Sequence, residues 1–129
     1  MKKIISILFI LFATTTIVNA QDQKAMSQKL LRHVVLFKFK DGVKAEDMKK
    51  VEDAFHALPS KIKEIQTFEW GINNSPENLN QGFTHCFFLT FASEADRAVY
   101  LPHPAHKAFG GILGPYIDKV LVLDYWAAQ

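Results

Sequence analysis

Residues 83–91 constrain the fold of this 129-residue chain more than any other stretch, because they are largely apolar on both faces of a strand. Side chains alternate between the two faces of a strand. One face therefore carries Phe83, His85, Phe87, Leu89 and Phe91, and the other carries Thr84, Cys86, Phe88 and Thr90. A strand of this kind belongs in the middle of a sheet with both faces covered. The sequence thus predicts a central strand and a fold that covers it from two sides.

The other segments supply three more strands and two helices. Apolar, β-branched and aromatic residues predict strands at 31–40, 65–72 and 118–126. Apolar side chains at helical spacing predict an amphipathic helix from about residue 44 to Pro59, and Ser93 with Asp96 resembles a capping box that opens a second helix at 94–101. Loops are expected at 73–82 and around Gly110-Gly111 and Gly114-Pro115.

This order of elements is strand, helix, strand, strand, helix, strand. It predicts an α+β, ferredoxin-like βαββαβ fold with one four-stranded antiparallel sheet and the helices on one face. The chain is too short to supply a third layer for the other face. A second copy that packs sheet against sheet is the economical cover, so we expect a homodimer.

Residues 1–20 have the pattern of a secretory signal peptide, because Lys2 and Lys3 precede an apolar run and small residues lead up to Ala20. A transmembrane anchor is the alternative, but the run is shorter than the roughly 20 residues that a bilayer span needs. We expect removal of this segment, a flexible mature N-terminus at 21–30, and a periplasmic or secreted protein that has no membrane partner.

Cleavage leaves 109 residues, the size of one compact domain. It also removes two of the 15 basic residues, so that 13 basic side chains balance 13 acidic ones. A neutral chain lacks the basic surface that a nucleic-acid partner requires. Cys86 is the only cysteine, so no internal disulfide is available and the apolar core must hold the fold together.

The one dense group of chemically active side chains lies in residues 100–109, where Tyr100, His103 and His106 surround two prolines. Proline cannot continue a helix but is tolerated at its first position. Pro102 is therefore expected to end one helix and Pro104 to begin another. This places His103 at the cap and His106 in the new turn.

Each candidate has both a chemical and a structural interpretation. His106 is the best candidate for a general base, because imidazole exchanges its proton near neutral pH, and its structural alternative is a histidine that lines an apolar pocket. Tyr100 can hold a carbonyl or a developing enolate by hydrogen bonding, or it can simply pack its ring. His33 and His85 are either site residues or structural hydrogen-bonding histidines. His103 is expected to cap a helix, and His56 to be solvated.

Other kinds of site find less support. His103 and His106 are three residues apart, but a closed zinc site needs about four ligands and no motif places the others, so no metal is expected. Gly110-Gly111 lacks the surroundings of a phosphate-binding loop, and no nucleophile-elbow serine is present. Cys86 lies within an apolar strand, which disfavours a reactive thiol.

Several of these segments together resemble the stress-responsive α/β barrel (Dabb) domain family of the dimeric α+β barrel superfamily. The likeness rests on residues 32–40, on Gly82 to His85, on Tyr100 with the run His103 to His106, and on the closing residues 123–126. It indicates one Dabb domain over residues 31–127. It also implies a homodimer independently of the argument from layers.

The motif residues are similar to those of the plant polyketide-cyclase branch of the olivetolic acid type. That resemblance implies a cofactor-free aldol cyclisation in which a tyrosine and a histidine are aided by histidines on strands. The matching positions are Tyr100, His106, His33 and His85. Two functions remain open: a cofactor-free acid–base lyase or cyclase-like enzyme acting on a small aromatic or dicarbonyl compound, and a non-catalytic stress-response dimer that binds a small hydrophobic molecule.

Overall fold

The computed structural model describes residues 29–128 as four strands and three helices. They are β1 (Leu31–Phe39), α2 (Ala45–His56), β2 (Thr67–Ile72), β3 (His85–Phe91), α3 (Glu94–Tyr100), α4 (Pro104–Leu113) and β4 (Ile117–Trp126). The expected signal segment and nearly all of the expected flexible N-terminus lie outside these residues. The predicted α+β ferredoxin-like fold is confirmed.

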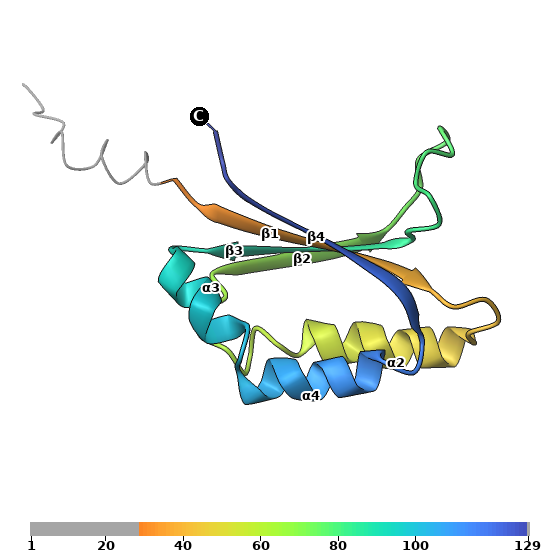
Figure 1. The fold of residues 1–129 in the computed structure, drawn as a ribbon, viewed down its shortest axis with the longest axis horizontal. Coiled ribbons are helices and arrows are strands. Elements are labelled where there is room, and N and C mark those ends of the chain that lie inside the picture. The colour runs from red at the N-terminus through yellow and green to blue at the C-terminus, as the bar shows by residue number, and fades with distance from the viewer. Residues whose placement is uncertain (1–28, 129) are drawn as a thin grey trace, which may run out of the picture.

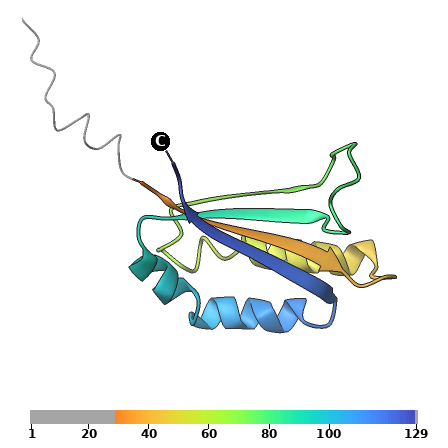
Figure 2. The ribbon, with the colours of Figure 1, turned by 45° about the horizontal axis from the view of Figure 1, so that its top comes forward.

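The four strands form one antiparallel sheet in the order β2-β3-β1-β4. The central position predicted for β3 is confirmed, since it pairs with β1 on one side and β2 on the other. All three helices lie on one side of this sheet, and α2 and α4 run next to each other beneath it (Figures 1 and 2). Within residues 29–128 no element covers the opposite face of the sheet.

The apolar core lies between the sheet and the helices, where aromatic rings from four elements meet. The ring of Phe55 on α2 stacks on Phe87 of β3 at 4.2 Å, and Phe37 of β1 lies 5.0 Å from Phe87. Phe109 of α4 packs 4.7 Å from Phe55. Each fully buried side chain of this size contributes about 1.5–3 kcal/mol to folding, so this aromatic group ties both long helices to the sheet.

One loop prediction is wrong: Gly110 and Gly111 lie inside α4. Glycine costs a helix about 1 kcal/mol relative to alanine. Here Phe109 and Leu113, four residues apart on one helical face, are both buried and hold the turn between them. The packing of that face outweighs the intrinsic preference of the two glycines.

No helix within residues 29–128 has both the length and the apolar character needed to cross a bilayer.

Candidate functional site

The predicted break at the two prolines brings Tyr100 and His106 together. Ser93 accepts a hydrogen bond from the Asp96 amide and caps α3, which ends at Tyr100 just before Pro102. Pro104 then begins α4. The two helices meet so that the rings of Tyr100 and His106 have centroids only 4.3 Å apart.

The structure confirms the capping role of His103. Its Nδ1 accepts a hydrogen bond from the Ala105 amide at 3.1 Å, as an N-cap side chain does. His56 is exposed, as expected. Among the described residues no three His, Cys, Asp or Glu side chains converge as a metal ion would require.

Tyr100 is fully buried, and its hydroxyl makes no hydrogen bond within the described residues. The rings of His33, Phe91 and His106 surround it. Burial, with a smaller contribution from the nearby Asp124 carboxylate, raises the pKa of Tyr100 well above its usual range. The phenol therefore keeps its proton and can act as a hydrogen-bond donor, but not as a base near neutral pH.

His106 is oriented by the backbone that precedes it. Its Nδ1 lies 2.9 Å from the carbonyl oxygen of Leu101. A carbonyl can only accept, so Nδ1 carries the hydrogen, and the neutral ring leaves its Nε2 lone pair free. This is the tautomer that a general base acting through Nε2 requires.

His33 belongs to the same site, together with an acidic residue that the sequence did not single out. Its Nδ1 lies 2.8 Å from Oδ1 of Asp124 on β4, and that oxygen is also 3.3 Å from a guanidinium nitrogen of Arg97 on α3. The carboxylate can only accept, so Nδ1 of His33 carries the hydrogen of this contact. The His33 ring meets Tyr100 edge-on at 5.6 Å.

These residues line a cavity of about 480 Å³ between the sheet and α4. Val35, Phe37, Phe55, Phe109 and Leu113 supply much of its apolar lining. Its polar groups are His33, Tyr100, His106, Asp124 and Lys107. An apolar cavity of this size with a few convergent polar groups is the usual form of a small-molecule site.

His85 does not lie with the other three predicted residues. In the sheet it pairs with Phe37, four residues along β1 from His33, or roughly 13 Å at ~3.3 Å per residue. Both of its nitrogens are occupied, since Nε2 lies 3.0 Å from Glu52 and Nδ1 lies 2.8 Å from the Thr84 hydroxyl. His85 therefore joins α2 to β3 and does not line this cavity.

Asp124, Arg97 and Lys107 are site residues that the sequence analysis missed. Asp124 could have been found from the sequence, because it interrupts the apolar strand that follows Asp118. In the alternation of that strand it falls on the same face as Val120 and Val122. Nothing in the sequence pointed to Arg97 or Lys107, because charged residues on short helices are usually solvated.

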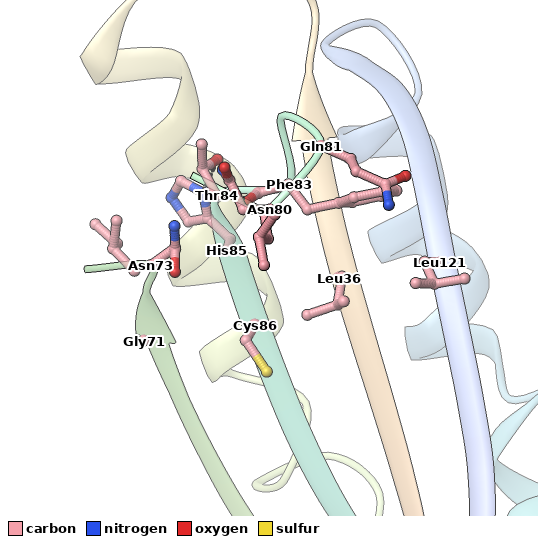
Figure 3. Close-up of a pocket in the computed structure, with 12 residues that line it drawn as sticks. Leu36, Gly71, Asn73, Asn80, Gln81, Phe83, Thr84, His85, Cys86 and Leu121 are labelled. Atoms are coloured by element: carbon pink, nitrogen blue, oxygen red, sulfur yellow. Dashed lines mark hydrogen bonds between the residues drawn. The ribbon is translucent and has the colours of Figure 1, made fainter. Parts of the chain in front are cut away.

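A second cavity, of about 430 Å³, lies on the opposite face of the sheet. Leu36, Cys86 and Leu121 form its floor, and the loop between β2 and β3 forms its wall (Figure 3). Burial raises the pKa of the Cys86 thiol, with a smaller contribution from Glu69. This keeps the sulfur protonated and unreactive, and the cavity holds no cluster of catalytic groups.

Comparison with known proteins identifies relatives of this chain. The sequence profile of the stress responsive A/B barrel domain, Dabb, matches residues 31–127. The stress-response A/B barrel domain-containing protein HS1 of Arabidopsis thaliana is 43% identical over 95 residues, which cover 74% of this chain and 87% of that protein. Olivetolic acid cyclase of Cannabis sativa is 28% identical over 95 residues, covering 74% and 94% of the two chains.

Solved structures show the same fold. The hydroxynitrile lyase of Passiflora edulis superposes with a TM-score of 0.74 at 25% identity, covering 79% of this chain and 96% of that one. A dimeric ferredoxin-like protein of unknown function from Bacteroides fragilis superposes with a TM-score of 0.63 at 31% identity, covering 76% and 96%. Relatives of this fold thus include a cyclase, a lyase and proteins without a known activity.

Proposed function

The chain belongs to the stress responsive A/B barrel domain family, and from that premise we propose that it is a cofactor-free acid–base catalyst of the lyase or cyclase-like kind. Its substrate is a small aromatic or dicarbonyl compound that fits the apolar cavity beside α4. One observation carries the proposal: the buried Tyr100 hydroxyl has no protein partner, although it lies next to an imidazole with a free lone pair.

An unpaired hydroxyl in an apolar site costs free energy, and natural folds rarely leave one without a reason. A carbonyl oxygen of a ligand is the partner that a protonated phenol lacks. The Tyr100 hydroxyl would donate to that oxygen and stabilise it as negative charge develops. The raised pKa of Tyr100 favours this role, because the phenol remains a donor throughout the neutral range.

His106 supplies the complementary half of the reaction. Its Nε2 takes a proton from a C–H or O–H next to the carbonyl, and the electron pair left behind moves onto the carbonyl oxygen held by Tyr100. The resulting enolate forms a carbon–carbon bond with a second carbonyl or expels a leaving group. The imidazolium then returns its proton, so the cycle balances without metal or cofactor.

His33 and Asp124 complete the surroundings as a hydrogen-bonded pair. The Asp124 carboxylate accepts the Nδ1 hydrogen of His33, which orients the His33 ring edge-on to Tyr100. We assign this pair the role of placing the carbonyl and relaying protons. His85, with both nitrogens occupied, stabilises the fold in this proposal.

The second candidate function is a binding protein without catalysis. It is favoured by the closed position of the Tyr100 hydroxyl, which a ligand reaches only if neighbouring rings shift. In that case the same apolar cavity holds a hydrophobic molecule and the two imidazoles line its wall.

Solvent exchange separates the two functions. Phenylacetone is a small aromatic ketone with an acidic C–H beside its carbonyl, and NMR in D₂O follows replacement of that hydrogen. An enzyme of the proposed kind accelerates the exchange, and His106→Gln abolishes the acceleration. If phenylacetone binds but exchanges at the rate seen in buffer alone, the binding function holds and the catalytic proposal fails.

Two adjacent glycines provide a matched control for the location of the site. Gly110 lines the cavity and Gly111 does not, and a Cβ at either position meets nothing within 4 Å. Gly110→Leu is therefore expected to fill the cavity and block phenylacetone, whereas Gly111→Leu is expected to leave binding unchanged. Equal effects of the two variants would place the ligand elsewhere.

We further propose that the protein is a homodimer that packs sheet against sheet. The face opposite the helices exposes Leu121, Leu123 and Tyr125 of the edge strand β4, each at least 39% accessible. A patch of this kind on a sheet usually marks an interface. Leu123→Glu is expected to give a monomer in a sizing experiment, while Val99→Glu, at an exposed apolar residue of α3, keeps the dimer. A wild-type protein that is monomeric at micromolar concentration would contradict the proposal.

We also propose that the protein is exported, on the pattern of residues 1–20 alone. Expression of the full chain followed by N-terminal sequencing should find Gln21 as the first residue of the mature form. Recovery of a cytoplasmic protein that still begins at Met1 would overturn it.

A further inference from the structure

We propose that the ligand of the cavity beside α4 carries a negative charge on an apolar body, and that Lys107 recognises this charge. This inference rests on the proposed function, because it names the class of molecule that the same site takes. It assigns to Lys107 a role in specificity, separate from the chemistry of Tyr100 and His106.

Lys107 is the only basic residue other than histidine that lines the cavity. It lies in the first turn of α4 directly after His106, and its side chain is exposed. Within residues 29–128 its ammonium group has no ion-pair or hydrogen-bond partner. The long stem of a lysine can lie along apolar surface while the charged end stays at the opening.

The one carboxylate in the cavity does not neutralise Lys107. Oδ1 of Asp124 is bound to His33 and Arg97, and Arg97 balances its charge from outside the cavity lining. The charged groups at the site are therefore Asp124 with Arg97 as one compensated pair and Lys107 as an uncompensated cation.

The helix that carries Lys107 adds to this field. The N-terminus of a helix bears about half a positive charge, and acidic side chains in the first turn commonly offset it. The first turn of α4 contains no acidic residue. Lys107 and this helix end are therefore two features at the cavity that favour an anionic ligand, and Tyr100, whose buried hydroxyl makes no hydrogen bond, is among the residues that line it.

The opening beside Lys107 has space for such a group. Gly110 lies three residues further along α4, on the same side of the helix, and a Cβ placed there meets nothing within 4 Å. Val120 and Val122 of β4 also line the cavity. A carboxylate can lie at this opening near Lys107 while an aromatic or aliphatic body contacts Phe37, Phe55 and Phe109.

Two ligands of the same size test the charge directly. 3-Phenylpropionate and 3-phenylpropionamide share their skeleton and differ in the negative charge, and calorimetric titration measures the affinity of each. The wild-type protein is expected to prefer the carboxylate by up to about fivefold, the range of a partly exposed ion pair. The preference should shrink when the salt concentration is raised, because screening weakens such pairs.

Substitutions of Lys107 locate the preference. Lys107→Gln is expected to bind both ligands equally, and Lys107→Glu to prefer the amide. Lys61→Gln, which removes an exposed lysine of the loop after α2, should keep the wild-type preference. A carboxylate preference that survives Lys107→Gln, or a wild-type protein that does not distinguish the ligands, overturns the role of Lys107 and leaves the proposed function standing.

Failure of the site itself gives a different result. If neither ligand binds the wild-type protein, or if Gly110→Leu leaves the binding of both unchanged, the cavity is not the binding site and both proposals fall. Binding of both ligands with equal affinity refutes only the charge preference.

Discussion

Replacing Tyr100 with phenylalanine should make the folded protein more stable while it removes the proposed activity. Removing the hydroxyl takes one oxygen atom from a fully buried position at which it makes no hydrogen bond. Leaving such a group unpaired costs about 1–3 kcal/mol. The phenylalanine ring keeps the packing against Phe91 and His33, so only the small void left by the oxygen offsets the gain.

The expected net effect is an increase of about 1 kcal/mol in the free energy of unfolding. For a domain of this size that corresponds to a rise in Tm of roughly 4–8 °C. Most substitutions at buried positions destabilise a protein, so a gain here is a specific result. Urea denaturation and a thermal melt measure it. Tyr116→Phe makes the same chemical change at a partly buried tyrosine outside the cavity and should bring no gain.

Alkaline pH gives a second, independent measure of the same hydroxyl. The pKa of Tyr100 is raised in the folded state, so above the ordinary value of about 10 the unfolded chain loses this proton first. The contribution of Tyr100 to stability is therefore fully present below pH 10 and is lost as the pH rises, by up to about 1.4 kcal/mol per pH unit. Tyr100→Phe should lack this loss, so the difference between the two proteins widens from pH 10 to pH 11.

Destabilisation of Tyr100→Phe by 1 kcal/mol or more at pH 7 would refute the reasoning. It would show that the hydroxyl has a partner in the unliganded protein, and the main support for a ligand carbonyl at this position would disappear. Stabilisation together with unchanged solvent exchange of phenylacetone would instead confirm the unpaired hydroxyl and refute its part in catalysis.

Three further changes test the elements around the site. Ser93→Ala should lower the free energy of unfolding by about 1 kcal/mol in urea, because the α3 cap loses its acceptor for the Asp96 amide. Gly111→Ala should raise it by roughly 0.5–1 kcal/mol, since the added methyl group meets no atom within 4 Å and alanine favours a helix. His85→Ala should lower the free energy of unfolding by about 2 kcal/mol, because Glu52 loses its partner. At a temperature where this variant is folded, its binding of phenylacetone should be unchanged. Loss of binding at that temperature would place His85 in the site.

The order of elements and the central strand could be predicted because periodicity and burial are local in sequence. The pattern of residues 83–91 requires cover on both faces wherever the strand lies, and β3 is indeed internal in the sheet. The extent of α4 could not be predicted, because the two glycines signal a loop and only the buried Phe109 and Leu113 hold them in the helix. Whether the two glycines join the helix depends on tertiary packing, which the helix propensities of single residues do not describe.

Some features of the candidate site could likewise be predicted from the sequence, and others could not. The closeness of Tyr100 and His106 could be predicted, since Pro102 and Pro104 lie between them, each within four residues of both, and break the helix there. Whether His33 and His85 share the site stayed open, because both point to the helix side and only the register between β1 and β3 sets them four residues apart. The role of Asp124 becomes clear only from the pairing of β4 with β1, which places the carboxylate beside His33.

The position of the cavity follows from how the helices cover the sheet. On β3 the side chains that face the helices, such as Phe87 and Leu89, are completely buried. On β4 the corresponding side chains Val120 and Val122 each remain 45% exposed, although they lie on the same face of the same sheet. The helical layer therefore covers the central strands β1 and β3 tightly and leaves a gap against the edge strand β4. The cavity occupies that gap, and the break between α3 and α4 turns Tyr100 and His106 toward it. An apolar gap of this kind forgoes packing energy that a larger side chain at position 110 could supply, which is the expected cost of keeping a binding site open.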